Sequence, residues 1–418
     1  MIYIYVYPVG VRVFQARFKT RPAPHLSPTP NHLPTKHDPD KLRRLRRATD
    51  DAPRCVRGKT RYCDSTCQHD HWRRGHKQIC KKIHRGGNAE HYNADGKYKE
   101  AVAVAIEKCA DDTKDQTCYI CTEALHWKTK EGIVRGCSCR GTAGFAHVSC
   151  LAEQAKILVA EAEEDNWDDD RFMPRWRRWK SCSLCEQQYH GVVRCALGWA
   201  CWKTYVGRPE DDENRGLAMN LLGTGLQGIF AYEDALTVFE AELFMERRSG
   251  GPEESILTVQ NNIANSYEKL GRHEEALHVR QDVYSGRLKL GGEENESTLR
   301  AANNYAATLQ DMNRNEEAKP LLRKTIPVAR RVLGECDLIT LTMNRIYGES
   351  LYMDPAATLD DLREAVKTLE DTKRIARQVL GGAHPISVNM EEVLRASRSA
   401  LRARETPEDY FGNILGSA

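Results

Sequence analysis

The sequence predicts a mainly α protein in which small cysteine-rich modules precede an α-solenoid of helix pairs. Fourteen of the fifteen cysteines lie before residue 202, and the second half of the chain holds only Cys336. Beyond residue 211 the sequence is helix-forming and repeats itself with a period near 42 residues. The 418 residues, 40% of them apolar and 29% charged, are enough for about two to four globular domains.

Clustered cysteines without a secretory signal indicate metal ligands in a reducing compartment. The opening residues 1–14 are apolar, but Pro8 and Gly10 interrupt them and no basic region precedes them, so they are not typical of a signal peptide. No run approaches the ~18 apolar residues of a membrane span. We therefore expect a soluble, intracellular protein with no membrane partner, and both nuclear and cytoplasmic residence stay open.

Composition divides the chain into six predicted segments. Residues 1–54 are rich in Pro and Arg and lack periodicity, so we expect a disordered basic N-terminus. Its KLRRLRR run, residues 41–47, is either a solvated linker or an arm for nuclear import or nucleic acid. We favour the linker, so nucleic acid is not an expected partner. The other segments are a first Cys/His module at 55–84, a linker helix at 85–112, a second Cys/His module at 113–205, helical repeats at 211–405 and a tail at 406–418.

The first Cys/His cluster contains Cys63-x3-Cys67 and His76-x3-Cys80. Residues three or four apart share one helical face, so each pair is able to supply two metal ligands. With its Cys-Gln pair and following tryptophan, the segment resembles the C-terminal half of a MYND zinc finger, whose upstream half is represented only by Cys55. Either these four ligands form one rearranged zinc site or the N-terminus is incomplete. An unrelated zinc knuckle and a basic helix without metal also stay open.

Eight further Cys and His residues form four closely spaced pairs. The pattern is Cys-x2-Cys, 15 residues, Cys-x1-Cys, seven residues, His-x2-Cys, 31 residues and Cys-x2-Cys. Two pairs supply the four ligands of a tetrahedral zinc ion, so four pairs predict two zinc ions. The alternative, buried or free thiols without metal, leaves the spacing unexplained. The predicted ligands are Cys118, Cys121, Cys137, Cys139, His147, Cys150, Cys182 and Cys185.

The stretch CSCRGTAGFAHVSCL, residues 137–151, resembles the RING-CH (RING-variant) family, with Cys as fourth ligand and His as fifth. The resemblance implies a cross-braced zinc module that docks a ubiquitin-conjugating enzyme, with Ile120 as a contact residue. This sequence departs from the family in lacking a proline between the last two ligands and in placing acidic Glu186 where active ligases often carry a cation. The two implied sites are Cys118, Cys121, His147 and Cys150, and Cys137, Cys139, Cys182 and Cys185.

Other residues near the second module are expected to have structural roles. The 31-residue gap before its last pair predicts an inserted loop or helix. Four tryptophans are expected to pack around the module rather than to stack on nucleic-acid bases, namely Trp176, Trp179, Trp199 and Trp202. Four cysteines without paired spacing are expected to be buried as small apolar residues, namely Cys109, Cys195, Cys201 and Cys336.

The second half of the chain contains a repeated tetrad. Its fourth position recurs at separations of 41, 42 and 44 residues, at Ala235, Ala276, Ala318 and Leu362. In the second unit, Ile256, Val259, Ile263 and Tyr267 share one helical face, and Gly271 ends the helix. A second helix is predicted from about 274 to 290. Such helix pairs bury their apolar faces only by stacking, which predicts an α-solenoid of about four pairs.

The repeated unit TVQNNIANSYEKLGRHEEALHVRQDVY and its copy at 300–326 resemble the kinesin-light-chain type of tetratricopeptide repeat. The resemblance covers roughly residues 211–405 and implies a concave surface that binds a peptide or protein. In this family paired asparagines help to hold the backbone of an extended peptide, because an amide donates and accepts hydrogen bonds. It implies partner binding by Asn261, Asn262, Asn303 and Asn304, with an exposed polar face as the alternative.

Two functions from different classes follow from these features. The first is a RING-type ubiquitin ligase, in which the second module recruits the conjugating enzyme and the repeats recruit a protein substrate. The second is a non-enzymatic adaptor whose zinc fingers and tetratricopeptide repeats bind proteins. The expected cofactor is zinc, with two ions in the second module and a third if the first module also binds metal. No residue is predicted to be catalytic.

Overall fold

The computed structural model describes residues 89–165 and 168–405. Within these ranges the chain is helical, and its extended pairings are isolated bridges between Val134 and Ala146 and between Ser181 and Gln188. The predicted mainly α class is therefore confirmed. No helix in the described ranges is long and apolar enough to cross a lipid bilayer. The N-terminal segment, the tail and the first module lie outside the described residues, and with them Cys55, Cys63, Cys67, His76 and Cys80.

The helices of the described ranges fall into two groups. The first accompanies the second Cys/His module and consists of α4 (Ala89–Cys109), α5 (Val148–Glu164), α6 (Asp169–Trp176), the 3-10 helix η2 (Arg177–Trp179) and α7 (Gly191–Tyr205). The second forms the repeats and consists of α8 (Glu213–Gln227), α9 (Tyr232–Ser249), α10 (Glu253–Lys269), α11 (His273–Gly291), α12 (Glu296–Asp311), α13 (Asn315–Val332), α14 (Leu338–Met353), α15 (Leu359–Leu380) and α16 (Pro385–Glu405).

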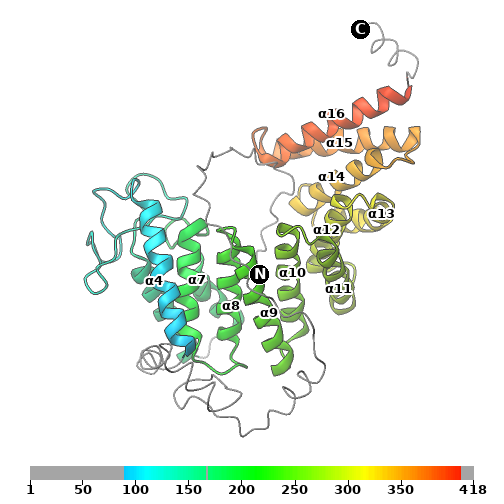
Figure 1. Cartoon of the computed structure of the whole chain (residues 1–418). Helices are drawn as coiled ribbons and strands as arrows, with labels where there is room; N and C mark the ends of the chain where they lie inside the picture. The colour runs from blue at the N-terminus through cyan, green and yellow to red at the C-terminus, as the bar shows by residue number, and fades with distance from the viewer. Residues whose placement is uncertain (1–88, 166–167, 406–418) are drawn as a thin grey trace, which may run out of the picture.

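The repeats form the predicted α-solenoid. Each of helices α8 to α16 packs against the next one in sequence, and Figure 1 shows them following one another from green to red. The repeated alanine explains the period, because Ala235, Ala276 and Ala318 are fully buried in the core between neighbouring helices. A larger side chain at any of them would force the helices apart. The predicted turn residue Gly271 has a φ of +75°, a left-handed conformation that suits glycine.

Helix α7 joins the Cys/His module to the repeats. Its Gly198 lies against α8, where an added Cβ would be 3.0 Å from the Cα of Leu222. Gly225 of α8 lies against α7 in return, where a Cβ would be 3.1 Å from the Cα of Cys195. The two helix backbones therefore touch at both glycines. Because α4 packs along the same helix, α4, α7 and α8 lie side by side (Figure 1).

An ion pair also fastens the Cys/His module to the first repeat. Arg208 donates to both carboxylate oxygens of Glu163, at 2.5 and 2.8 Å, and Asn214 donates to the same carboxylate at 2.5 Å. Glu163 lies in the last turn of α5, whereas Asn214 lies in the first turn of α8. Arg208 lowers the pKa of Glu163 accordingly. The segment before Cys182 contains α5, α6 and η2, so of the two predicted alternatives, loop or helix, its described residues are mainly helical, and α5 is anchored to the repeats.

Most of the tryptophans and unpaired cysteines are buried or partly buried, as the sequence analysis predicts. Trp176 and Trp179 are buried in the core shared by the module and α7, and Trp199 and Trp202 are partly buried against it. Cys109, Cys195 and Cys201 are buried thiols. The expectation for Cys336 is wrong: this thiol is exposed. It lies in the turn between α13 and α14, where no neighbouring helix covers it.

Glu242 of α9 is a buried carboxyl group with an incomplete set of hydrogen bonds. Only 3% of the residue is exposed. Asn220 donates to its Oε1 at 3.3 Å, while its Oε2 has no hydrogen-bond partner among the described residues. Burial raises the pKa of Glu242 well above its ordinary value, and the charge of Glu246 adds to the shift. The folded state therefore resists ionisation of this group at neutral pH.

Glu242→Gln is expected to stabilise the protein at pH 7. The unfolded chain ionises Glu242 near pH 4.5, whereas the folded chain keeps it protonated, so the native carboxyl costs stability as pH rises above that value. We expect a gain on the order of 1–3 kcal/mol at pH 7 that disappears by pH 4. Denaturant unfolding at both pH values measures it, with the exposed Glu233→Gln on the same helix as control. An equal gain at both pH values would contradict the explanation.

Candidate metal centres and interaction surfaces

Four predicted ligands from two separate segments meet at the first centre. Cys118 and Cys121 lie in the turns that follow α4, while His147 and Cys150 lie at the start of α5. Their ligand atoms all lie within 4.8 Å of one another. Nδ1 of His147 is 3.3 Å from Sγ of Cys121 and 3.6 Å from Sγ of Cys150. A zinc tetrahedron with bonds of ~2.3 Å to sulfur and ~2.0–2.1 Å to nitrogen has N···S edges of about 3.5 Å.

The second centre consists of sulfur atoms alone. The Sγ atoms of Cys137, Cys139, Cys182 and Cys185 all lie within 4.8 Å of one another, and that of Cys139 is 3.8 Å from that of Cys182. A tetrahedral zinc site with four sulfur ligands has edges of about 3.8 Å. Gly144 covers this centre with a φ of +83°, and an added Cβ would lie 2.8 Å from Sγ of Cys137. Only glycine therefore fits at this position.

The two Cys-x2-Cys turns have the same local geometry. In each turn the backbone N–H of the third residue, Ile120 or Leu184, lies 3.4 Å from the first sulfur. The residue after each second cysteine has a positive φ, +64° at Thr122 and +57° at Glu186. That conformation is unfavourable for a side chain with a Cβ, above all for β-branched threonine. Both turns thus adopt a strained backbone that directs N–H groups at sulfur, and such bonds favour the thiolate form that binds metal.

Neighbouring residues hold His147 and the start of α5 in place. Nε2 of His147 lies 3.4 Å from the carbonyl oxygen of Ala124, which leaves Nδ1 to face the sulfurs. The carboxylate of Glu131 accepts hydrogen bonds from the backbone N–H and the hydroxyl of Ser149, at 2.7 and 2.9 Å. It therefore caps a helix that has no cap from its own N-cap side chain. A second hydrogen bond that fixes the orientation of a ligand histidine is typical of protein metal sites.

The donor sets of both centres fit zinc. All eight predicted ligands of this module are thiols or imidazole, and the described cysteines are free of disulfides. Burial, and after it the charge of Cys118, raises the pKa of the Cys150 thiol above its ordinary value. Closely packed thiols resist joint ionisation, and a divalent cation reverses this effect by binding the thiolates. Tetrahedral sulfur and nitrogen donors select zinc over magnesium or calcium.

An exposed apolar surface lies over the two Cys-x2-Cys turns. Ile120 is 37% exposed and Leu184, its counterpart in the second turn, is 52% exposed. A hydrogen bond of 3.0 Å between the hydroxyls of Tyr119 and Ser183 links the two turns that carry these exposed side chains. Sequence reasoning found Ile120 and missed Leu184. The sequence does contain a signal for Leu184, because each turn has an aliphatic residue directly before its second cysteine.

Arg178 clamps the second of these turns. Its guanidinium donates to both carboxylate oxygens of Glu186, at 2.9 and 3.0 Å, and to the carbonyl oxygen of Cys182 at 3.2 Å. One side chain thereby connects the two ends of the turn. A proline is absent from this turn, and the clamp restrains it by a different means. Arg178 also places a positive charge next to Glu186, the acidic residue that follows the last predicted ligand.

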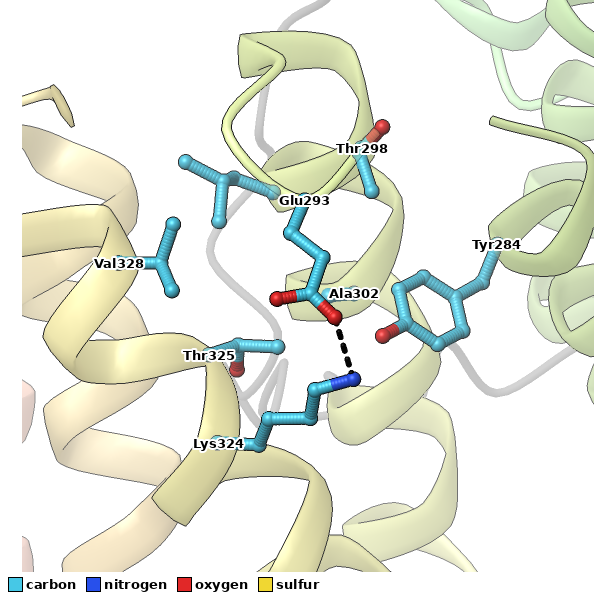
Figure 2. Close-up of a pocket in the computed structure, with 8 residues that line it drawn as sticks. Tyr284, Glu293, Thr298, Ala302, Lys324, Thr325 and Val328 are labelled. Atoms are coloured by element: carbon cyan, nitrogen blue, oxygen red, sulfur yellow. Dashed lines mark ion pairs between the residues drawn. The ribbon is translucent and has the colours of Figure 1, made fainter. Parts of the chain in front are cut away.

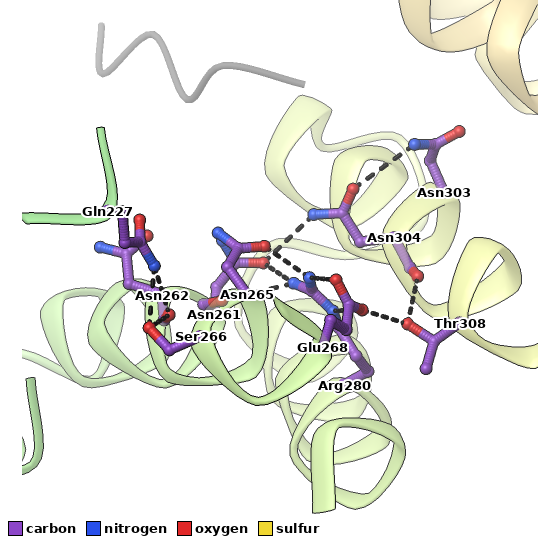
Figure 3. Close-up of polar contacts among 10 residues, drawn as sticks. All are labelled: Gln227, Asn261, Asn262, Asn265, Ser266, Glu268, Arg280, Asn303, Asn304 and Thr308. Carbon is purple, nitrogen blue, oxygen red and sulfur yellow. Dashed lines mark hydrogen bonds and ion pairs between the residues drawn. The ribbon is translucent and has the colours of Figure 1, made fainter. Parts of the chain in front are cut away.

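Three of the four predicted partner-binding asparagines are buried in a polar network between helices (Figure 3). Arg280 of α11 reaches α10, where it donates to Oδ1 of Asn261 at 2.5 Å and to Oδ1 of Asn265 at 2.6 Å. It also forms an ion pair with Glu268 at 3.1 Å. Although burial alone would raise it, Arg280 holds the pKa of Glu268 below its ordinary value. The network therefore connects the two helices of the second repeat.

The same network continues into the next repeat. Nδ2 of Asn304 donates to Oδ1 of Asn261 at 3.1 Å, and the hydroxyl of Thr308 donates to Glu268 at 2.5 Å. Nδ2 of Asn261 and Oδ1 of Asn303 have no hydrogen-bond partner among the described residues, although these residues are only 5% and 2% exposed. The repeat period extends the asparagine pattern to Asn220 and Asn344, which sequence reasoning did not name. Asn344 is also buried, and it accepts from Arg330 at 2.9 Å.

A small depression lies between α11, α12 and α13 (Figure 2). Glu293 and Lys324 form an ion pair of 2.6 Å beside Tyr284. The space has room for about one water molecule. It is therefore too small to hold an organic ligand.

Comparison with known proteins identifies the repeats. Residues 255–331 match the family model of the tetratricopeptide repeat. The prediction of tetratricopeptide repeats is confirmed for this segment, which forms a tetratricopeptide-repeat scaffold for protein interaction within the solenoid. The match does not extend to the Cys/His modules, so their likeness to RING-CH and MYND fingers stays a prediction. No curated protein sequence matches the chain significantly.

Solved structures similar to this chain include several repeat proteins. BtubC (BKLC) from P. vanneervenii aligns with 65% of this chain and 91% of its own, at 14% identity and a TM-score of 0.40. The nearly identical TPR-like repeats of a putative kinesin light chain from Podosopora anserina align with 56% of this chain and 97% of their own, at 16% identity and a TM-score of 0.38. The TPR2AB domain of yeast Sti1, in complex with pHSP90, aligns with 60% of this chain and 99% of its own, at 11% identity and a TM-score of 0.22.

Proposed function

We propose that the module around residues 113–205 binds two zinc ions in a cross-braced arrangement. The support is the interleaved order of the ligands, since the first and third pairs form one centre and the second and fourth pairs form the other. The ions would hold the two Cys-x2-Cys turns rigidly and thereby fix the apolar surface of Ile120 and Leu184. Zinc has a structural role in this proposal, and it takes part in no chemical step.

The function that this geometry supports best is that of a RING-type ubiquitin ligase. The observation that supports this function is the exposure of Ile120 and Leu184 on two linked metal-binding turns. These side chains offer a docking surface for a ubiquitin-conjugating enzyme. The module itself forms no bond with the substrate. A substrate amine attacks the thioester carbonyl of ubiquitin, an amide bond forms and the enzyme thiol leaves, while the ligase contributes proximity and restraint. The repeats recruit the protein that supplies the amine.

Ile120→Ala combined with Leu184→Ala is expected to reduce ubiquitin transfer at least about tenfold, because small apolar hot spots dominate such interfaces. Zinc content and thermal stability are expected to stay at the wild-type level, since both side chains are exposed. The assay measures ubiquitin chains formed by the full chain with a panel of conjugating enzymes. Ile157→Ala, another exposed isoleucine on α5, is the matched control. Absence of chain formation by the wild-type protein with every enzyme of the panel would refute ligase activity.

A non-enzymatic adaptor is the second candidate, and a specific observation favours it. Glu186 follows the last predicted ligand and neutralises Arg178, the cation placed beside it, through two hydrogen bonds. An adaptor would use the same apolar surface and the same repeats to hold two proteins together. Under this alternative the double alanine variant loses a binding partner in pull-down experiments, while the wild-type protein transfers no ubiquitin.

A further inference from the structure

Two buried arginines contact the polar side chains of α10 and α14, and both are already neutralised. Arg280 donates to Glu268, Asn261 and Asn265, which leaves its guanidinium saturated. Arg345 of α14 is likewise buried and forms an ion pair with Glu349 one turn later. Neither cation is available to pair with an acidic group of a partner. An acidic peptide therefore finds no charge complement among these residues.

Asp311, at the end of α12, is different. It is exposed to solvent and forms no ion pair or hydrogen bond among the described residues. The charged groups that act on it are Glu268 of α10, His273 of α11, and Arg345 and Glu349 of α14. Two of these groups, Glu268 and Glu349, are the acids that form the ion pairs with Arg280 and Arg345. Asp311 is therefore a carboxylate that forms no ion pair within the described part of the chain, and the guanidinium groups of Arg280 and Arg345 are both occupied by other acids.

The polar network that joins α10 and α12 contains a buried hydrogen-bond donor without an acceptor. Nδ2 of Asn261 has no hydrogen-bond partner in residues 89–165 and 168–405, although Asn261 is only 5% exposed, and Asn261 lies beside Asn304 in Figure 3. Asn304 and Asp311 are both on α12, seven residues apart, which corresponds to about 10 Å along the helix. About three residues of an extended peptide span that distance. Because Asn261 lies beside Asn304, one short peptide segment is long enough to place a backbone carbonyl at Asn261 and a side chain at Asp311.

We propose that the surface around Asn261 and Asp311 binds a basic peptide segment, in which a lysine or arginine side chain pairs with Asp311. The inference rests on the proposed peptide-binding function of the repeats and specifies the chemical class of their partner. The partner's ammonium or guanidinium group replaces the missing cation of Asp311, and its main-chain carbonyl accepts the free N–H of Asn261. Charge complementarity across such a surface gives specificity more than raw affinity.

The pH dependence supports the same assignment. Although the side chain reaches solvent, desolvation by the surrounding helices, and after it the negative charges of Glu268 and Glu349, raises the pKa of Asp311 to about 6, against the opposing charges of Arg345 and His273. Asp311 therefore loses its charge as pH falls through about 6, within a range where lysine and arginine stay protonated. Binding of a basic segment is expected to weaken by at least about threefold between pH 7.5 and pH 5, and Asp311→Asn is expected to remove this dependence.

Selection from a random dodecapeptide library on the full chain tests the proposal without assuming a sequence. The expected result is enrichment of lysine or arginine at one position, which Asp311→Asn abolishes and the exposed Glu335→Gln control preserves. A selected lysine peptide is expected to bind at least about tenfold more tightly than its glutamine counterpart by fluorescence anisotropy, and Asp311→Asn is expected to equalise the two. Peptides selected without a basic position, or an unchanged preference in Asp311→Asn, overturn this inference alone. Failure to select any peptide overturns peptide binding by the repeats as well.

Discussion

Cys182→Ala is expected to unfold the second metal centre and to loosen the first repeat with it. Binding of a structural zinc ion contributes ~10–16 kcal/mol, a magnitude comparable with the whole stability of a typical domain. The effect is expected to reach the repeats because Gly136, beside the ligand Cys137, packs on Val193 of α7. Helix α7 in turn contacts α8 through Gly198. Loss of the centre therefore removes the support of the helix that covers the first repeat.

Hydrogen exchange of the full chain measures this coupling. We expect faster exchange in α7 and α8 of Cys182→Ala, with little change in α14 and α15, which lie far along the solenoid. Cys336→Ala is the matched control, because its thiol is exposed and belongs to neither centre. Unchanged protection of α8 in a Cys182→Ala protein that has lost metal would show that the two halves fold independently.

Arg280→Met is expected to destabilise the repeats by about 2–4 kcal/mol, because it leaves the partly buried charge of Glu268 without its partner. Asn261 and Asn265 lose a donor at the same time. Denaturant unfolding of the full chain, followed by helical circular dichroism, measures the change. Arg314→Met is the control: its ion pair with Glu317 is exposed, so we expect a change within about 0.5 kcal/mol. Equal effects of the two variants would contradict the structural role of the network.

A second variant separates the ion pair from the volume of the side chain. Adding Glu268→Gln to Arg280→Met removes the unpaired charge and is expected to recover part of the lost stability. If the double variant is no more stable than Arg280→Met, the loss comes from packing instead.

The repeats were predictable because their period has a simple physical cause. Ala235, Ala276 and Ala318 are fully buried, so in three successive units the sequence returns to a small residue where two helices pack. The pairing of the metal ligands was also implied before the structure, through the family resemblance of residues 137–151. Both predictions rest on positions where few other residues fit, either because the space is small or because a metal ligand is required.

Other features depend on contacts between distant segments and left no local signal. The period places Asn261 and Asn303 on a helix, but it does not say how deeply each amide is buried. At Asn261 the amide is covered by Arg280, which approaches from the following helix. The contact of α7 with α8 depends on Gly198 and Gly225, which in the sequence look like ordinary helix glycines. The clamp of Arg178 on Glu186 joins residues eight apart through the fold of the turn.

Zinc stoichiometry of the full chain and of two ligand variants tests the central claim most directly. Elemental analysis is expected to find at least two zinc ions per wild-type chain, and three if the N-terminal module also binds metal. Cys118→Ser with Cys121→Ser and, separately, Cys182→Ser with Cys185→Ser are each expected to lower the count by one. Fewer than two ions in the wild-type protein, or an unchanged count in both variants, would contradict the pair of interleaved zinc centres.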